Sequence, residues 1–232
     1  MNRTLGIVLS VVALIAVVSV GVFLYLTREI AAPSTDIDEA VQTIEPAADT
    51  TSEVIFQIDQ EGTNAEYHIF EVLNGSDKTV VGATNQVAGE IALNLSDLSL
   101  SRVGELRINA RTFATDSDRR DNAVARFILQ SENDANEFIV FVPTALTGLS
   151  GSAAVGDTVE FQVTGDLTVA GVTQSITFNV TAVLEADTLL TGHAETVISR
   201  AAFNLTIPNV PSVTNVGDEV TLKLDFSASS AA

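Results

Sequence analysis

Residues 165–180 read GDLTVAGVTQSITFNV. Apolar and polar residues alternate on both sides of Ala170–Gly171, and alternation with a period of two is typical of β-strands that have one apolar face. The glycine in the middle marks a turn. The stretch therefore predicts a β-hairpin, whose apolar face contacts either a packed core or a bound molecule.

The same alternation continues over most of residues 54–229, in about eight or nine segments separated by turn residues. Only residues 116–129, DSDRRDNAVARFIL, fit a helix. Its expected apolar side consists of Ala123, Val124, Phe127 and Ile128. Many closely spaced strands indicate an all-β sandwich or a closed barrel. Long strands favour a barrel, which has no exposed edge, but the pattern alone leaves both architectures open.

The composition excludes several classes of function. The chain of 232 residues carries a formal net charge of −19, so it would repel nucleic acids, and we expect no nucleic-acid partner. It has no cysteine, which excludes disulfides, cysteine-type zinc sites and thiol catalysis.

The N-terminal segment 1–30 is expected to anchor the protein in a membrane. Leu5–Leu26 contains no charged residue and is long enough to cross the bilayer as a helix. Arg3 and the free amine precede it, which favours a cytoplasmic N-terminus and places the rest of the chain outside. The competing interpretation is a cleaved signal peptide, although the apolar run is longer than usual for one. In both cases the rest of the chain is exported, and the first predicts a single-pass protein of the cell membrane.

Between this anchor and the β-rich domain lies an acidic segment. Residues 31–53 read AAPSTDIDEAVQTIEPAADTTSE, with acidic residues, two prolines and no basic residue. Such a composition predicts a flexible, solvated linker, extended by its own charge. The sequence therefore divides into an anchor (1–30), a linker (31–53) and a β-domain (54–229).

Three stretches together resemble one known family. They are GELRINARTFATDSDRRDNAVARFIL (104–129), GDLTVAGVTQSITFNV (165–180), and ISRAAFNLTIPNV (198–210) followed by VGDEVTLKLDF (216–226). Their order and spacing resemble the YceI-like family of polyisoprenoid-binding proteins, over roughly residues 53–229. The resemblance implies an antiparallel, eight-stranded, lipocalin-like barrel with one short helix, an apolar lumen and an exported location. It also implies that the ligand is an isoprenoid chain, such as a polyprenyl lipid or a quinone-like molecule.

The alternation within the strands identifies candidates for side chains that point into the lumen. These are Phe56, Phe70, Leu93, Ile108, Phe161, Phe178 and Phe226. They could pack against each other, because an eight-stranded barrel is just narrow enough to be filled by side chains. The absence of tryptophan and the small residues on several strands favour a lumen that holds a ligand.

Several of the few basic residues occur close together. Arg111, Arg119, Arg120 and Arg126 lie near Asp116, Asp118 and Asp121 in the sequence. One interpretation is a set of salt bridges at the mouth of the barrel. The other assigns Arg119 and Arg120 to the head group of the ligand, a pyrophosphate or a quinone ring.

The sequence therefore predicts a membrane-anchored, extracytoplasmic protein that stores or transfers an isoprenoid lipid or quinone. The alternative is a non-catalytic accessory subunit of a membrane complex, with a filled barrel and Leu5–Leu26 packed against the other subunits. An enzyme is not expected, since no nucleophile–base set is present. We also expect no metal and no cofactor, because a site at His68 or His193 would need at least one more convergent ligand, which the spacing does not show.

Overall fold

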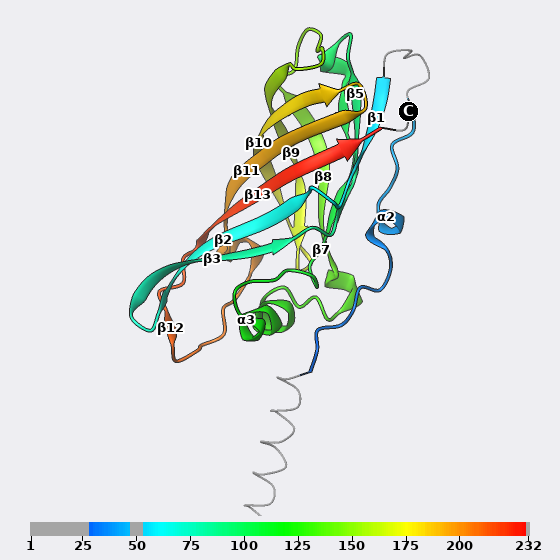
Figure 1. Cartoon of the computed structure of the whole chain (residues 1–232). Coiled ribbons are helices and arrows are strands. Elements are labelled where there is room, and N and C mark those ends of the chain that lie inside the picture. Colours follow the sequence, from blue (N-terminus) through cyan, green and yellow to red (C-terminus); the bar gives the residue numbers. More distant parts are fainter. Residues whose placement is uncertain (1–27, 47–52, 231–232) are drawn as a thin grey trace, which may run out of the picture. The chain divides into compact units, whose positions relative to one another are not determined.

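The computed structural model describes residues 28–46 and 53–230 (Figure 1). The expected transmembrane segment Leu5–Leu26 lies outside these residues. Within the two described ranges, no helix is both long and apolar enough to cross a membrane. The contacts divide the chain after Ala31, and the β-rich fold belongs to the unit Ala32–Ala232.

The fold is one antiparallel sheet, which has 13 strands in the described residues. The strands are β1 (Glu53–Ile58), β2 (Asn64–Leu73), β3 (Ser76–Thr84), β4 (Val87–Ala88), β5 (Glu90–Asn94), β6 (Arg102–Val103), β7 (Leu106–Asn109), β8 (Phe138–Thr147), β9 (Thr158–Val169), β10 (Val172–Ala186), β11 (Leu189–Ser199), β12 (Val213–Thr214) and β13 (Glu219–Ser229). The prediction of an all-β antiparallel fold is confirmed, but the expected number of eight strands differs from the structure.

The higher strand number arises where long apolar runs bend. Residues 79–95 read as one strand in the sequence, but the chain forms β3, β4 and β5 along this stretch. Each of the three pairs with a different neighbour: β3 with β2, β4 with β7, and β5 with β1. This bent segment thus connects both ends of the row β7–β8–β9–β10–β11–β13–β1, and the sheet curls around an interior (Figure 1).

The hairpin predicted over residues 165–180 is confirmed. Strands β9 and β10 pair with Val169 opposite Val172, and Ala170 and Gly171 form the turn with φ of 48° and 78°. Two positive φ values in a two-residue loop match the twist of the flanking strands, and glycine adopts them without strain. The apolar face of this hairpin points toward the interior of the curled sheet.

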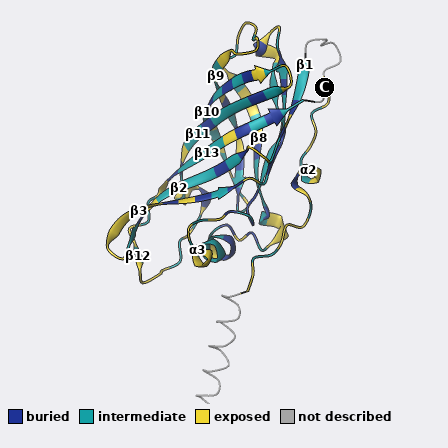
Figure 2. Cartoon of the chain, in the orientation of Figure 1, coloured by how far each residue is buried: buried dark blue, intermediate teal, exposed yellow. Residues whose placement is uncertain are grey.

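Helical turns lie at the end of the sheet that also carries the β9–β10 turn. The loop between β7 and β8 contains α3 (Asp118–Ala123), a π-helical turn (Val124–Ile128) and the 3₁₀ turn Asp134–Asn136. The same end carries the β2–β3 hairpin tip and β12, which pairs with β2; we call it the α3 end. Further 3₁₀ turns are Leu98–Leu100 and Ala201–Phe203. Figure 2 shows the hairpin tips more exposed than the middle of the sheet.

The expected helix over residues 116–129 is confirmed in position, and its expected apolar side faces the interior at Ala123, Val124 and Ile128 but not at Phe127. A π turn contains more residues per turn than an α-helix, which rotates the side chains that follow it. As a result Ala125 and Arg126 are buried, whereas Phe127 is 41% exposed. Ser117 precedes the helix, but its side chain makes no capping hydrogen bond.

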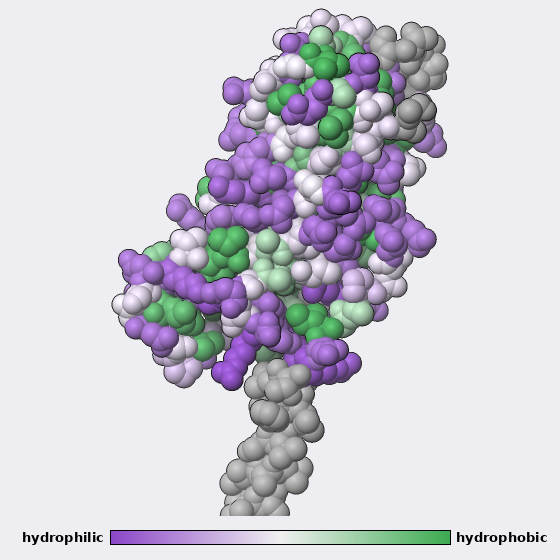
Figure 3. Space-filling view, viewed as in Figure 1, coloured by the Kyte–Doolittle hydropathy of each residue, from purple (hydrophilic) through white to green (hydrophobic). Residues whose placement is uncertain are grey.

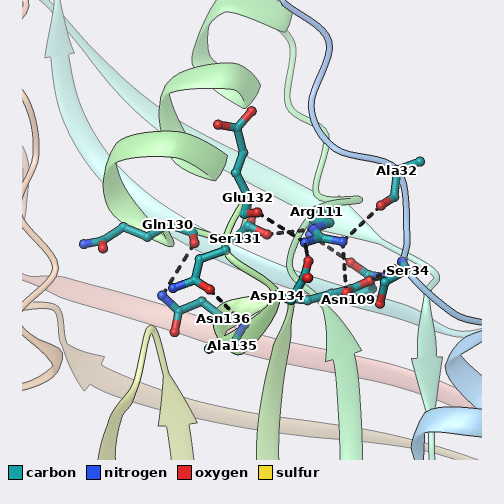
Figure 4. Close-up of polar contacts among 12 residues, drawn as sticks. Ala32, Ser34, Asn109, Arg111, Gln130, Ser131, Glu132, Asp134, Ala135 and Asn136 are labelled. Carbon is teal, nitrogen blue, oxygen red and sulfur yellow. Dashed lines mark hydrogen bonds and ion pairs between the residues drawn. The ribbon is translucent and has the colours of Figure 1, made fainter.

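Residues 32–46 run along the outside of the sheet and include the short helix α2 (Ile37–Ala40). We call this segment the strap. At its start, Arg111 Nη1 donates to the carbonyl of Ala32 (3.0 Å) and Ser34 N donates to Glu137 Oε1 (2.7 Å). At its end, Arg102 Nη2 donates to the carbonyl of Glu45 (3.1 Å). Figure 4 shows the contacts around Arg111.

The strap differs from the flexible linker that the sequence predicts for residues 31–53. Its acidic composition indicates a solvated chain, yet Ile37 is only 1% exposed, and α2 packs against β4 and β7. One buried isoleucine, several hydrogen bonds to the sheet and partly buried side chains such as Ile44 order this segment. Residues 47–52 lie outside the described residues.

Replacing Ile37 with aspartate is expected to release the strap. Burial of an isoleucine stabilises by about 1.5–3 kcal/mol, so the open population rises about 10- to 100-fold. Hydrogen–deuterium exchange of the backbone amides in residues 37–44 measures this change. Glu39→Gln, an exposed position on the same helix, is the control. Unchanged exchange in Ile37→Asp would mean that hydrogen bonds alone hold the strap.

Candidate functional site

The curled sheet encloses a cavity of about 620 Å³. Its wall consists mainly of aliphatic and aromatic side chains from β2, β5 and β7–β13, with charged residues near the ends. The volume lies within the range of about 300–1,000 Å³ that is usual for small-molecule sites. Figure 3 shows that hydrophilic and hydrophobic residues are interspersed on the outer face that it displays. The cavity wall, in contrast, is mainly apolar.

Five of the seven residues proposed for the lumen line this cavity. They are Leu93, Ile108, Phe161, Phe178 and Phe226. Most of them are only half-buried although they point inward, because part of their surface faces the cavity. Alternation along β5, β7, β9, β10 and β13 thus identified the inner face of these strands.

Phe70 does not line the cavity, and its side chain is 42% exposed. The inner face of β2 instead carries Tyr67, Ile69 and Glu71. The alternation there is misleading, because a carboxylate occupies an inward position and a phenylalanine an outward one.

Phe56 faces inward but does not line the cavity. It lies opposite Ile91 in the β1–β5 ladder, on the same face of the sheet, and is 0% exposed. It belongs to the packed core beside the cavity. The interior of the sheet therefore contains both a packed core, which includes Phe56, and an unfilled cavity.

Glycines next to aromatic residues shape the cavity wall. A Cβ at Gly82 would collide with the ring of Tyr67, one at Gly165 with Phe141, and one at Gly192 with Phe226. Each ring thus occupies the space beside a glycine of a neighbouring strand, where any larger residue would collide with it. Phe141 also makes an edge-on contact with Phe178, with 5.2 Å between the ring centroids.

A group of charged side chains lies at the α3 end of the cavity. Arg120 Nη2 contacts Glu71 Oε1 at 3.1 Å, and its Nη1 bonds Asp116. Asp116 also bonds Lys78 Nζ. These two partners hold the pKa of Asp116 below its ordinary value, Lys78 first and Arg120 second. The salt-bridge interpretation therefore holds for Arg120, with Glu71 as a partner that the sequence did not indicate.

The other three arginines of the cluster lie in different surroundings. Arg111 is buried and pairs with Glu137 (2.9 Å) and Asp134 (2.6 Å), and Arg126 pairs with Glu132 (3.0 Å). Arg119 is exposed and lines the cavity mouth, and the described residues offer it no hydrogen bond or ion pair. Of these four arginines, Arg119 and Arg120 line the cavity and Arg111 and Arg126 do not.

Tyr67 is a cavity residue that the sequence analysis missed. Its ring packs against Phe113, with 5.4 Å between centroids, and its hydroxyl is buried without a hydrogen-bond partner in the described part of the chain. Burial, and next the charge of Asp121, raises the pKa of Tyr67 above its ordinary value. Tyr67 precedes Ile69 by two residues on the same strand, and such residues point to the same face of a sheet. This spacing could have identified Tyr67 as a residue that points inward.

The two histidines make ion pairs on separate strands. His68 Nε2 contacts Glu66 at 2.6 Å, and His193 Nδ1 contacts Asp225 at 2.7 Å. Over residues 28–46 and 53–230, no group of three or more histidine, aspartate or glutamate side chains is arranged to hold a metal ion.

Comparison with known proteins identifies the family. Residues 56–228 match the YceI-like domain. None of the curated proteins matches the chain. Among solved structures, Burkholderia cenocepacia BcnA is similar at a TM-score of 0.57 with 19% identity, covering 74% of this chain and 99% of that protein.

A second similar structure is described as a polyisoprenoid binding domain from Saccharophagus degradans. It superimposes at a TM-score of 0.58 with 12% identity, over 77% of this chain and 99% of that domain. At such identities the two structures show a shared fold. The match to the family covers well over half of the sequence, and the chain therefore belongs to the YceI-like domain family.

Proposed function

We propose that the protein is a membrane-anchored, extracytoplasmic lipid-binding protein that holds an isoprenoid chain in the lumen of its barrel. The observation that carries the proposal is the apolar cavity of about 620 Å³ inside the curled sheet. Family membership supports it, as does the similar fold of a domain described as polyisoprenoid binding. The role is one of binding, for storage or transfer, without catalysis.

The energetics of the cavity suit a long hydrocarbon ligand. Each methylene that moves from water into an apolar site contributes about 0.8 kcal/mol. About ten such groups would supply about 8 kcal/mol, close to micromolar affinity before the cost of ordering the chain. An isoprenoid needs no specific polar contact along its length, and the wall is mainly apolar.

The proposed anchor Leu5–Leu26 fits such a ligand. Isoprenoid lipids and quinones reside in the bilayer, and a tethered binding domain meets them at high effective concentration. The strong negative charge of the chain would also limit adhesion to anionic head groups. In this proposal the membrane and the isoprenoid are the two partners of the protein.

The alternative function, an accessory subunit of a membrane complex, predicts a barrel filled by its own side chains. The cavity favours the carrier over this alternative. Both roles could combine if the complex uses an isoprenoid quinone.

Native mass spectrometry tests the proposal. The full-length chain is expressed in a bacterial host, extracted in mild detergent and weighed intact. We expect an adduct that releases an isoprenoid upon denaturation. The proposal fails if the protein has its apo mass and takes up neither squalene nor a quinone with two isoprene units; the accessory role would then be favoured.

A further inference from the structure

The hydroxyl of Tyr67 belongs to the cavity wall and lies near the charged side chains of the α3 end. Strand β2 points the side chain inward, between Ala65 and Ile69. The hydroxyl is buried, and no group in the described residues accepts or donates a hydrogen bond to it. Because a buried hydroxyl without a partner is unfavourable, its presence indicates that a bound molecule supplies the missing partner.

The position of this hydroxyl is fixed by its surroundings. Tyr67 lies opposite Gly82 in the β2–β3 ladder, and the ring occupies the space that a Cβ at Gly82 would take. On another side the ring contacts Phe113, at an interplanar angle of 59°. The phenol is thus held between two strands and a loop, so its hydroxyl is preorganised.

The charges that act on the hydroxyl are unfavourable for an anionic head group. They come from Asp121, Arg120 and Glu71, and Arg119 at the cavity mouth, which is unpaired among the described residues, is not among them. Arg120 is already bound by Glu71 and Asp116, and Asp116 also neutralises Lys78. The carboxylate of Asp121, which accepts from Thr115, adds negative charge near Tyr67. A phosphate brings between one and two further negative charges, which would repel these carboxylates. An uncharged acceptor meets no such opposition.

The phenol of Tyr67 stays uncharged, so its hydroxyl can donate one hydrogen bond or accept one as a neutral group. Burial raises the pKa of Tyr67, with Asp121 as the next cause, so the hydroxyl stays protonated at neutral pH. Its natural partner in an apolar site is therefore a carbonyl oxygen, which has lone pairs and no proton.

We propose that the Tyr67 hydroxyl donates a hydrogen bond to a carbonyl oxygen on the head of the ligand, and that the cavity prefers quinone-type isoprenoids over phosphorylated ones. This inference rests on the proposed function, in which the lumen holds an isoprenoid chain. It assigns recognition of the head to Tyr67, while Arg120 is occupied by Glu71 and Asp116.

The test compares three probes with the full-length wild type and Tyr67→Phe in detergent. The probes are a quinone with two isoprene units, geranyl pyrophosphate, which carries the same number of isoprene units, and squalene, which has no head group. We expect tighter binding of the quinone than of the pyrophosphate. Loss of one hydrogen bond should weaken quinone binding about five- to tenfold in Tyr67→Phe and leave squalene unchanged.

Infrared spectroscopy of the bound quinone reports the contact itself. Its carbonyl stretch should lie at lower frequency in the wild type than in Tyr67→Phe, which a merely structural role of the ring would not produce. Gly82→Ala, which displaces the phenol, should resemble Tyr67→Phe.

The outcomes separate the two proposals. If squalene binds but Tyr67→Phe binds the quinone as well as the wild type does, the role of Tyr67 is overturned and the lipid-binding function stands. Tighter binding of the pyrophosphate than of the quinone would equally overturn it. If none of the probes binds the wild type, the proposed function fails and this inference fails with it.

Discussion

Replacing Arg111 with alanine is expected to lower the free energy of unfolding by about 3–5 kcal/mol, because it leaves a buried carboxylate without its cation. The Arg111 and Glu137 side chains are only 3% and 1% exposed, and their Nη1 and Oε2 atoms are 2.9 Å apart. Arg111 also donates to the carbonyl oxygens of Ser131 (2.7 Å) and Ala32 (3.0 Å). One substitution therefore removes support from the β7–β8 loop and from the strap at once (Figure 4).

Thermal unfolding of the full-length protein in mild detergent, followed by circular dichroism, measures this loss. A domain of this size loses about 2–4 °C in Tm per kcal/mol, so a decrease of about 10 °C is expected for Arg111→Ala. Glu195→Gln is the control, because its ion pair with Lys223 lies on the surface and should contribute less than about 1 kcal/mol. Equal, small shifts in both variants would show that Glu137 finds other partners when Arg111 is absent.

This buried pair also shows where prediction from sequence stops. Arg111 lies close to Arg119, Arg120 and Arg126 along the chain, which predicts one shared cluster. In the structure, Arg111 pairs with Asp134 and Glu137, beyond the helical turns. Proximity in sequence identifies local ion pairs, but partners across a long loop depend on how that loop folds.

The strands were the most predictable part of the molecule. Alternation identified the hairpin of β9 and β10 and placed Phe161 and Phe178 on the face that lines the cavity. It failed on β2, where Glu71 is inside and Phe70 outside. The reason is the ion pair with Arg120, which makes a buried carboxylate tolerable and cannot be seen in a local pattern.

The strap shows a different limit. Composition predicts whether a segment can form its own core, and residues 31–53 cannot. It does not predict whether the segment attaches to a core that already exists. Ile37 is buried, and α2 packs against β4 and β7. A few apolar residues in a polar segment are a weak signal, but here one of them helps to attach the segment to the sheet.

Filling the lumen is expected to abolish ligand binding. Ala194 lies on β11 between Val180 and Leu224 of the neighbouring strands and lines the cavity. In Ala194→Trp, an indole that displaces about five carbons of a bound chain removes about 4 kcal/mol of burial. The affinity for squalene should therefore fall at least about 100-fold, as measured by uptake in native mass spectrometry.

Val197→Trp is the matched control, because Val197 is on the same strand but faces outward and is 55% exposed. It should bind squalene as the wild type does. Ala194→Leu, with a side chain smaller than tryptophan, should lose less squalene affinity than Ala194→Trp. It keeps the test valid if Ala194→Trp fails to fold. If Ala194→Trp keeps its circular dichroism spectrum and still binds normally, the ligand lies outside the lumen. If Val197→Trp loses as much affinity as Ala194→Trp, the outer face of β11 carries the site instead. A graded loss confined to Ala194 can arise only when the ligand and the side chain compete for the same volume.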